Sequence, residues 1–161
     1  MAISDIYTAR SGSVVTALTS AVPLHSVVGA TTIRGWCVGV RIDIIVTTAV
    51  AGNNALFQLC RPGNTMTGTT ATPAPSPHDV SAPASILSNY TAWSTAPTVG
   101  IVLWEQELPL TTGSSWEEFP PAGYEWQVPA IANAAANAGL HMFVTCSATG
   151  GTFSSNIIFS E

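Results

Sequence analysis

Apolar and polar residues alternate along much of this chain with a period of two, which is typical of β-strands with one buried and one open face. The clearest run is Trp36–Val46, where one face carries Trp36, Val38, Val40, Ile42, Ile44 and Val46, and the other carries Cys37, Gly39, Arg41, Asp43 and Ile45. The pattern predicts a half-buried strand whose second side faces solvent or a partner. Arg41 and Asp43 would be near neighbours on that outer face.

Similar runs predict about eight strands in all. The other seven are Ile3–Thr8, Val22–Val28, Ala55–Arg61, Val99–Gln106, Tyr124–Val128, Leu140–Ala148 and Phe153–Glu161. Gly, Pro and Asn residues separate them, as in antiparallel sandwiches and barrels. We therefore expect an all-β fold, a jelly-roll-like antiparallel β-sandwich, formed by a single domain over residues 1–161.

Two residue pairs have the composition of tight turns between adjacent strands, Asn53-Asn54 and Gly150-Gly151. The second pair predicts that the last two strands form a hairpin. The single helix candidate is Ile131–Ala138, which is rich in Ala and Asn and ends at Gly139. A helix of this length is marginal alone, so a loop fits this segment equally well.

The segment Pro62–Pro97 departs from the strand pattern because it is rich in Thr, Pro, Ser and Ala. Pro73, Pro75 and Pro77 favour an extended, polyproline-like path with few internal hydrogen bonds. A loop of this length is uncommon in a compact domain and is usually functional or disordered. The sequence predicts an ordered extended arm that lies on its own sandwich or on a neighbouring subunit.

The scarcity of charge changes the picture of the surface. Only 8% of the residues are charged, against about 25% in ordinary domains, and the only basic residues are Arg10, Arg34, Arg41 and Arg61. A surface of Ser, Thr, Ala, Asn and Pro suits a subunit packed against other protein, or a secreted or virion protein. A net charge of −5 argues against nucleic acid as a partner, because phosphate binding needs a basic stripe.

Membrane insertion and disulfide bonding are not expected either. No apolar run reaches the roughly 18 residues of a membrane-spanning helix, and residues 1–10 lack the pattern of a signal peptide. Cys37, Cys60 and Cys146 are odd in number and widely spaced. They are predicted to be small buried side chains in a protein made in reducing cytoplasm.

The chain lacks the signatures of several enzyme classes. Without lysine it has no phosphate-binding loop and no Schiff-base residue, and it contains no G-x-S-x-G elbow. His25, His78 and His141 lie far apart without metal-ligand spacing, which leaves only a site assembled from distant strands or around a symmetry axis. We expect no enzyme, no metal and no cofactor. His25 and His141 are predicted to be half-buried strand residues, and His78 to lie in a turn.

One enzymatic alternative remains, because several carboxylates stand beside aromatic residues. Glu105 and Glu107 share a strand face, Glu125 follows Tyr124, and Trp93, Trp116, Glu117 and Glu118 lie nearby in the sequence. A β-sandwich glycosidase needs two carboxylates about 5–9 Å apart, one acting as an acid and one as a nucleophile or base. The simpler interpretation is that these acids form the solvated outer face of strands whose Trp and Leu residues face the core.

Several segments taken in order resemble small β-sandwich proteins of tailed bacteriophages. They are Tyr7-Thr8-Ala9-Arg10, Leu59-Cys60-Arg61 with the Thr/Pro-rich arm after it, Trp104-Glu105-Gln106-Glu107-Leu108-Pro109, Phe119-Pro120-Pro121-Ala122-Gly123-Tyr124-Glu125-Trp126, and the closing hairpin. Such proteins decorate or cement the capsid or otherwise sit on the virion. The resemblance implies a homo-oligomer, expected to be a trimer, that is made in the bacterial cytoplasm and binds the major capsid protein or other virion proteins. It implies no catalytic residue.

The interface expected from these considerations comprises Arg61, Pro73, Pro75, Pro77, Trp93, Trp116, Tyr124 and Trp126. Gly123 can take the positive φ that a tight turn before the next strand requires. Tyr124 and Trp126 supply large apolar area with polar tips, which suits an interface as well as a core, although core packing is the commoner role of such residues. Arg61 could pin the arm by pairing with a carboxylate, or be an ordinary surface residue. The alternative function is recognition of host glycans through exposed Trp or Tyr residues.

Overall fold

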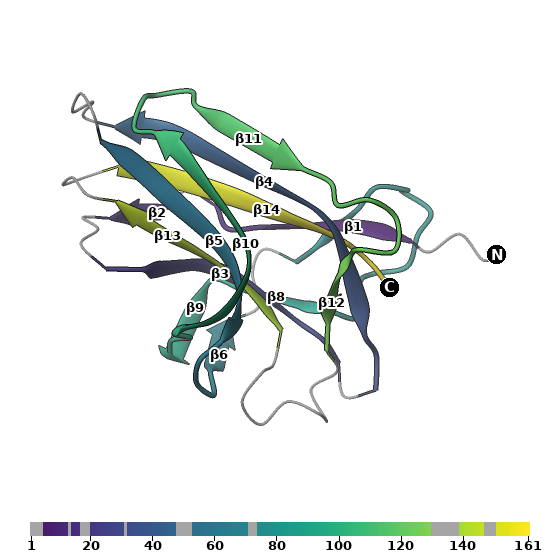
Figure 1. The fold of residues 1–161 in the computed structure, drawn as a ribbon. Helices are drawn as coiled ribbons and strands as arrows, with labels where there is room; N and C mark the ends of the chain where they lie inside the picture. Colours follow the sequence, from purple (N-terminus) through teal and green to yellow (C-terminus); the bar gives the residue numbers. More distant parts are fainter. Residues whose placement is uncertain are drawn as a thin grey trace.

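The computed structural model describes residues 5–12, 14–16, 20–30, 32–47, 53–70, 74–129, 139–146 and 151–161. Every helix or strand assigned in these ranges is a strand, and all the strand pairs are antiparallel (Figure 1). The expected all-β class is therefore confirmed. The helix candidate at 131–138 lies outside the described residues.

The strands are β1 (Ile6–Arg10), β2 (Val14–Thr16), β3 (Val22–Val28), β4 (Gly35–Thr47), β5 (Asn54–Pro62), β6 (Thr67–Thr70), β7 (Ser76–Pro77), β8 (Ser88–Tyr90), β9 (Ala92–Thr95), β10 (Val99–Pro109), β11 (Ser115–Glu118), β12 (Trp126–Val128), β13 (Leu140–Cys146) and β14 (Gly151–Ser160). Each of the eight predicted strands overlaps one of them, and the prediction for β3 has the observed bounds.

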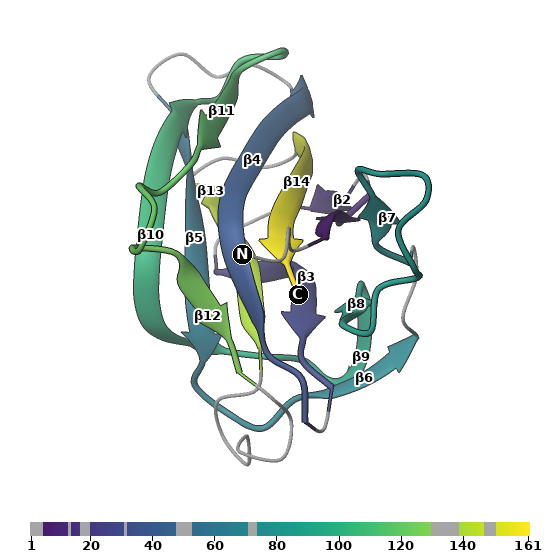
Figure 2. The same ribbon diagram turned by 90° about the vertical axis from the view of Figure 1, so that its right-hand side faces the viewer.

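Two main sheets make up the fold. Sheet A has seven strands in the order β11-β4-β14-β1-β7, with β12 also paired to β4 and β2 also paired to β14. Sheet B has five strands in the order β10-β5-β13-β3-β8, and β6 and β9 form a separate two-stranded ribbon. In Figure 2 the long strands β4 and β14 of sheet A lie beside β5 and β13 of sheet B.

The core lies between the inner faces of the two sheets. Both sheets contribute fully buried apolar residues, among them Val40, Ile42, Phe57, Leu59, Met142, Phe153, Ile157 and Phe159. The rings of Phe57 and Phe153 meet edge to face across the sandwich, with centroids 5.9 Å apart. Such packing stabilises the pair beyond the burial of its apolar area.

The strict alternation predicted for the longest strand is wrong at its beginning. In β4 the core face carries Cys37, Val40, Ile42 and Ile44, whereas Trp36 is exposed. The pairing with β14 shifts register between Cys37 and Gly39, so Val38 is an extra residue at a β-bulge. A bulge reverses the faces of the residues before it, and this one turns Trp36 away from the core.

The hairpin predicted for the last two strands is also wrong. β13 pairs with β3 and β5 in sheet B, whereas β14 pairs with β1, β2 and β4 in sheet A. Residue 150 and the preceding connection fall outside the described residues, so the predicted turn itself is not described. The turn composition of Gly150-Gly151 suggested a hairpin, but β14 pairs with β1, β2 and β4 from the other end of the chain.

The segment between β5 and β10, predicted to be an extended arm lying on its own sandwich or on a neighbouring subunit, has secondary structure of its own. It contains β6 to β9, and two of these strands extend the main sheets: β7 pairs with β1, and β8 pairs with β3, beside which it lies in Figure 2. Pro75 and Pro77 are half-buried here, and Pro77 lies opposite Tyr7. Pro73 lies outside the described residues. Short strands at sheet edges satisfy backbone groups that an extended arm would leave to water.

Candidate functional site

The outer face of sheet A carries exposed apolar side chains on its strands β4 and β1. Because Cys37 and Phe159 belong to the core, their neighbours Trp36 and Ser160 point outward, and these two residues are directly opposite each other in the β4–β14 pair. Ile6 on β1 lies opposite Ser160. Trp36 is 46% exposed and Ile6 is 39% exposed, so apolar side chains stand in solvent on this face.

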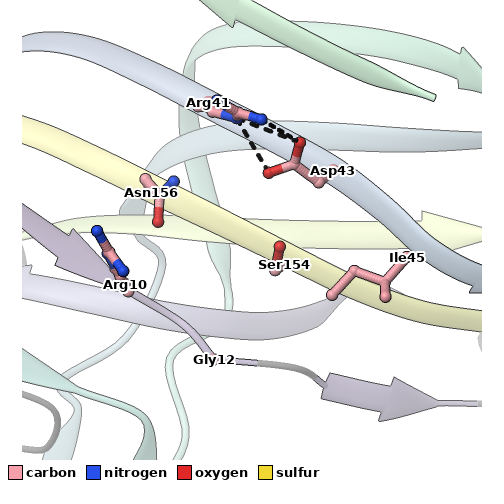
Figure 3. Close-up of a pocket in the computed structure, with 7 residues that line it drawn as sticks. All are labelled: Arg10, Gly12, Arg41, Asp43, Ile45, Ser154 and Asn156. Carbon is pink, nitrogen blue, oxygen red and sulfur yellow. Dashed lines mark hydrogen bonds and ion pairs between the residues drawn. The ribbon is translucent and has the colours of Figure 1, made fainter. Parts of the chain in front are cut away.

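A polar hollow occupies one part of this face (Figure 3). Asn156 on β14 lies opposite both Arg10 on β1 and Arg41 on β4, so the three residues form one row across three strands. The hollow has a volume of about 370 Å³, and its further lining residues are Gly12, Asp43, Ile45 and Ser154. Half of the arginines of the chain therefore meet at this one site.

The two arginines of the polar hollow differ in their partners. The Arg41 guanidinium donates to both carboxylate oxygens of Asp43 at 3.2 Å, which confirms their predicted proximity. The Arg10 guanidinium makes no hydrogen bond or ion pair with any residue in the described ranges. Arg10 therefore offers donors that fit a carboxylate or another anion from outside, since charge-assisted hydrogen bonds of this type are strong and directional.

A second, aromatic hollow lies on the same face. Trp36, Val38, Gly123, Glu125 and Ser160 line it, and its volume is about 330 Å³. Gly123 has φ of +89° and occupies the turn closed by the hydrogen bond from the Tyr124 N–H to the Pro121 carbonyl, at 2.9 Å. The positive φ predicted for Gly123 is thus confirmed.

The carboxylate of Glu125 is held in place at this aromatic hollow. It accepts a hydrogen bond from the Gly123 backbone N–H at 2.8 Å. This bond, and a further one from its own backbone N–H, lower the pKa of Glu125. Glu125 therefore presents a fixed, charged acceptor beside the Trp36 ring.

Sheet B has a different outer face. Because Met142 and Leu140 belong to the core, His141 and Phe143 point outward, yet both are buried. The β6–β9 ribbon packs near this side, and the Tyr90 ring on β8 lies directly against Gly68 on β6. The chain therefore covers part of sheet B with its own segments. On sheet A the Phe119 ring lies against Gly39, whereas Trp36, Ile6 and Ile45 stay exposed.

The predicted interface residues are spread over several places. Arg61 is half-buried and donates to the Gly139 carbonyl at 3.3 Å, so it has neither a carboxylate partner in the described ranges nor a fully exposed position. Trp93 is half-buried, and its Nε1 is enclosed. Trp116 on β11 is 43% exposed and donates to the Glu118 carboxylate at 3.3 Å.

Tyr124 and Trp126 have opposite environments. Tyr124 is 76% exposed, whereas Trp126 packs against the core. The two residues flank Glu125, so Tyr124 stands in the segment that forms the aromatic hollow and Trp126 anchors the same segment to β4. Of the predicted interface residues in the described ranges, Tyr124 and Trp126 lie in the segment that lines the aromatic hollow, and of these two only Tyr124 is exposed.

The carboxylates of the glycosidase alternative do not all come together: Glu105 and Glu107 share the outer face of β10, and Glu125 lies apart from them. Glu105 lies opposite Gln58 on the outer face of sheet B and accepts a hydrogen bond from it at 3.1 Å. Glu107 accepts from Asn54 at 3.1 Å. Glu125 belongs to the outer face of sheet A, on the other side of the sandwich. A pair on opposite faces cannot act on one glycosidic bond, so the described geometry favours the interpretation of these acids as solvated surface residues.

The histidines are more buried than predicted. His25 and His141 are both fully buried, not half-buried. The turn predicted at His78-Asp79 is present, because the Ala82 N–H donates to the Asp79 carbonyl. Within the described ranges, no group of three or more His, Cys, Asp or Glu side chains is arranged to hold a metal ion.

The cysteines are free and buried, as predicted. Burial raises the pKa of Cys37 to about 12 and that of Cys60 to about 11. Thiols with such high pKa values are poor nucleophiles because the thiolate is the reactive form. In these positions Cys37 and Cys60 act as small apolar side chains.

Sequence reasoning missed the residues that define both hollows, namely Arg10, Trp36, Asn156 and Ser160. The alternation of β14 would have placed Asn156 and Ser160 on one outer face, but not beside Arg10 and Trp36. That neighbourhood depends on which strands flank β14, and the Trp36 position depends on the bulge at Val38. Neither has a local signal in the sequence.

Comparison of the chain with family models, with curated proteins and with solved structures found no match. Among the described residues there is also no helix with the length and apolar character needed to cross a bilayer.

Proposed function

We propose that this protein is a structural component of a tailed-bacteriophage virion, a capsid decoration protein that binds the assembled head and stabilises it. In this proposal it is made in the host cytoplasm, acts as a homo-oligomer, expected to be a trimer, and resides on the capsid surface. Its partners are further copies of itself and the major capsid protein. The outer face of sheet A is the surface that meets them.

The proposed fold within the all-β class is a jelly roll of eight main strands. Its support is a nested pairing of strands from the two ends of the chain: β1 with β14, β3 with β13, β4 with β11 and β12, and β5 with β10. A long antiparallel pair of strands that wraps around a common core produces this nesting in jelly rolls.

The contrast between the two outer faces is the observation that carries the proposed function. On the inner strands β3 and β13 of sheet B the chain buries outward residues such as Ser26 and Phe143, and the exposed apolar residues described on this sheet lie on its edge strand β10 (Val99, Ile101 and Val102). On sheet A, by contrast, Trp36, Ile6 and Ile45 are exposed on the inner strands β4 and β1. Exposed apolar groups next to arginine donors are the composition of interface centres, in which Trp, Tyr and Arg contribute most of the binding energy. Surface charge normally keeps an exposed apolar face from associating with other proteins. This chain has only 8% charged residues, so it has few charges with that effect.

Decoration of this kind needs no chemistry at the site. A protein that binds the assembled shell but not its dissociated subunits shifts the equilibrium towards the shell by mass action. An oligomer binds through several copies of the same face, so individually weak contacts add up to stable attachment. The polar hollow would fix the orientation of the partner, because the Arg10 guanidinium can donate only to an anionic group that the partner places within hydrogen-bond distance.

The test uses heads of the encoding phage that were assembled without this protein. Adding the protein should raise the temperature at which the heads release DNA, and Arg10→Glu or Trp36→Ala should abolish the gain. Arg34→Glu is the matched control, because Arg34 is exposed but lines neither hollow. Light scattering after gel filtration should give a trimer at all concentrations. Heads that melt at the same temperature with and without bound protein contradict the proposal.

A further inference from the structure

The aromatic hollow differs from a simple apolar contact because its hydrogen-bonding groups are available. Within the described part of the chain, the indole N–H of Trp36 and the hydroxyl of Ser160 make no hydrogen bond. Trp116 has nearly the same exposure, 43% against 46%, but its indole N–H already donates to Glu118. The two tryptophans thus present similar ring area with different free donors.

The residues around Trp36 offer an apolar ring face, hydrogen-bond donors and a hydrogen-bond acceptor, which are the groups that bind a polyhydroxylated ligand. Trp36 supplies a ring face and a donor, Ser160 supplies a hydroxyl that donates or accepts, and Glu125 supplies an acceptor fixed by the Gly123 N–H. Val38 completes the apolar floor. The register fixes this arrangement, because Trp36 and Ser160 are direct cross-strand partners.

We propose that this hollow is a binding site for an uncharged saccharide. A sugar ring has an apolar C–H face that packs on an aromatic ring, and hydroxyl groups at its rim that both donate and accept hydrogen bonds. The volume of about 330 Å³ lies at the lower end of small-ligand sites, which suits one or two sugar residues. An aliphatic protein side chain would leave the Trp36, Ser160 and Glu125 groups without partners.

Charge restricts the class of saccharide. Among the described residues that line the hollow, Glu125 is the one ionisable group, and the whole chain carries a net charge of −5. A sialic acid or uronic acid would place a second carboxylate in this field and lose binding energy through like-charge repulsion. Neutral hexoses and N-acetylhexosamines meet no such penalty. The site therefore selects neutral glycans against acidic ones.

The test is saturation-transfer NMR followed by calorimetry on the full-length protein. The probes are maltotriose, cellotriose, mannotriose, chitotriose and lactose, with 3′-sialyllactose as the charged counterpart of lactose. At least one neutral probe should bind with a dissociation constant in the millimolar range or lower. Trp36→Ala should weaken it about tenfold, the scale of one lost aromatic contact. Glu125→Gln should weaken it about fivefold, the difference expected between a hydrogen bond to a charged acceptor and one to a neutral acceptor. Trp116→Ala should leave it unchanged.

Several outcomes would overturn the inference. They are the absence of binding by every neutral probe at about 10 mM, equal losses in the Trp36 and Trp116 variants, and equal affinity for lactose and 3′-sialyllactose. A change of native mass in Trp36→Ala without any saccharide binding would assign the hollow to protein docking instead. Because Glu125→Gln removes charge without removing bulk, it keeps the test valid if Trp36→Ala folds poorly. The inference does not depend on the proposed virion role. Trp36→Ala enters both tests, so Arg10→Glu separates them: it should abolish the heat-stability gain of the heads and leave saccharide binding unchanged, because Arg10 lines the polar hollow and not the aromatic one.

Discussion

The Nδ1 atom of His25 lies 3.0 Å from the Oδ1 atom of Asn89, and both side chains are fully buried. The amide of Asn89 also donates from Nδ2 to the Arg10 carbonyl at 2.8 Å, which orients its oxygen towards His25. His25 therefore carries its proton on Nδ1. These hydrogen bonds run from β3 through β8 to β1 and therefore join sheet B to sheet A. They end at Arg10, whose side chain lines the polar hollow.

Replacing Asn89 with alanine should destabilise the fold strongly. The substitution leaves the His25 N–H and the Arg10 carbonyl without these partners, and an unsatisfied buried polar group costs roughly 1–3 kcal/mol. We expect Asn89→Ala to lower the free energy of unfolding by about 3 kcal/mol in urea denaturation. Asn54→Ala is the control, because exposed Asn54 makes a single surface hydrogen bond to Glu107; its effect should stay below about 1 kcal/mol. Equal losses would show that Asn89 does not link the sheets.

His25 should make the stability depend on pH. Burial lowers its pKa to about 4; the hydrogen bond to Asn89 acts in the opposite direction, and nearby His141 lowers the pKa further. The His25 Nε2 atom has no hydrogen-bond partner in the described structure, so a proton added there would be a buried, unpaired charge. Between its unfolded pKa, about 6.5, and the folded value, the unfolded chain binds more protons than the native one. The His25 contribution to the free energy of unfolding is therefore fully present above the pKa of the unfolded chain, and it is lost as the pH falls towards about 4.

Urea denaturation at pH 7 and pH 5 measures this effect before most carboxylates titrate. From the two pKa values we expect a loss of about 2 kcal/mol between these pH values. His25→Gln should be less stable at pH 7 but should lose much less between pH 7 and pH 5. A variant with the same pH dependence as the unmodified protein would assign that dependence to other groups.

The sequence predicted local features well where burial alternates cleanly. In β10, Glu105 and Glu107 face outward while Trp104 and Leu108 face inward, as the pattern indicated. β3 was predicted with its observed bounds although it is buried on both faces. Local periodicity suffices in such cases because strand formation depends on the same alternation.

The candidate site could not be predicted in the same way. Arg10 and Arg41 are 31 positions apart in the sequence, and only the insertion of β14 between β1 and β4 places them on one row. The predicted β13–β14 hairpin would have produced a different neighbourhood. Strand order depends on packing between distant segments, and turn composition carries little information about it. The buried His25–Asn89 link has the same origin.

Gly68 should be required for the docking of the β6–β9 ribbon. A Cβ atom at this position would overlap the Tyr90 ring close to its root, so the ring cannot swing away easily. A Cβ at Gly39 would also meet a ring, at 2.7 Å, but that ring belongs to Phe119, which is 56% exposed and free to move. We expect Gly68→Ala to cost about 2 kcal/mol and Gly39→Ala less than about 1 kcal/mol in thermal or urea unfolding. The reverse order would mean that the ribbon does not rest on Tyr90.

Glu161 should fasten the segment between β5 and β10 to the sandwich. Its carboxylate accepts hydrogen bonds from the backbone N–H groups of Ile86, at 3.0 and 3.1 Å, and of Leu87, at 3.3 Å. The Tyr7 hydroxyl donates to the Pro83 carbonyl at 3.0 Å and holds the same stretch. Between these anchors and β7 stands Val80, which is 99% exposed.

Elastase cleaves after small aliphatic residues, so cleavage near Val80 reports how often this stretch opens. Glu161→Ala should raise the cleavage rate about fivefold, since losing about 1 kcal/mol of local stability raises the open population by that factor. Tyr7→Phe keeps the ring stacked on Phe159 and should act in the same direction with a smaller effect. Glu117→Ala, which removes an exposed carboxylate from the opposite edge of sheet A, should change nothing. If all three variants are cleaved at the rate of the unmodified protein, the strand pairing of β7 and β8 alone holds this segment.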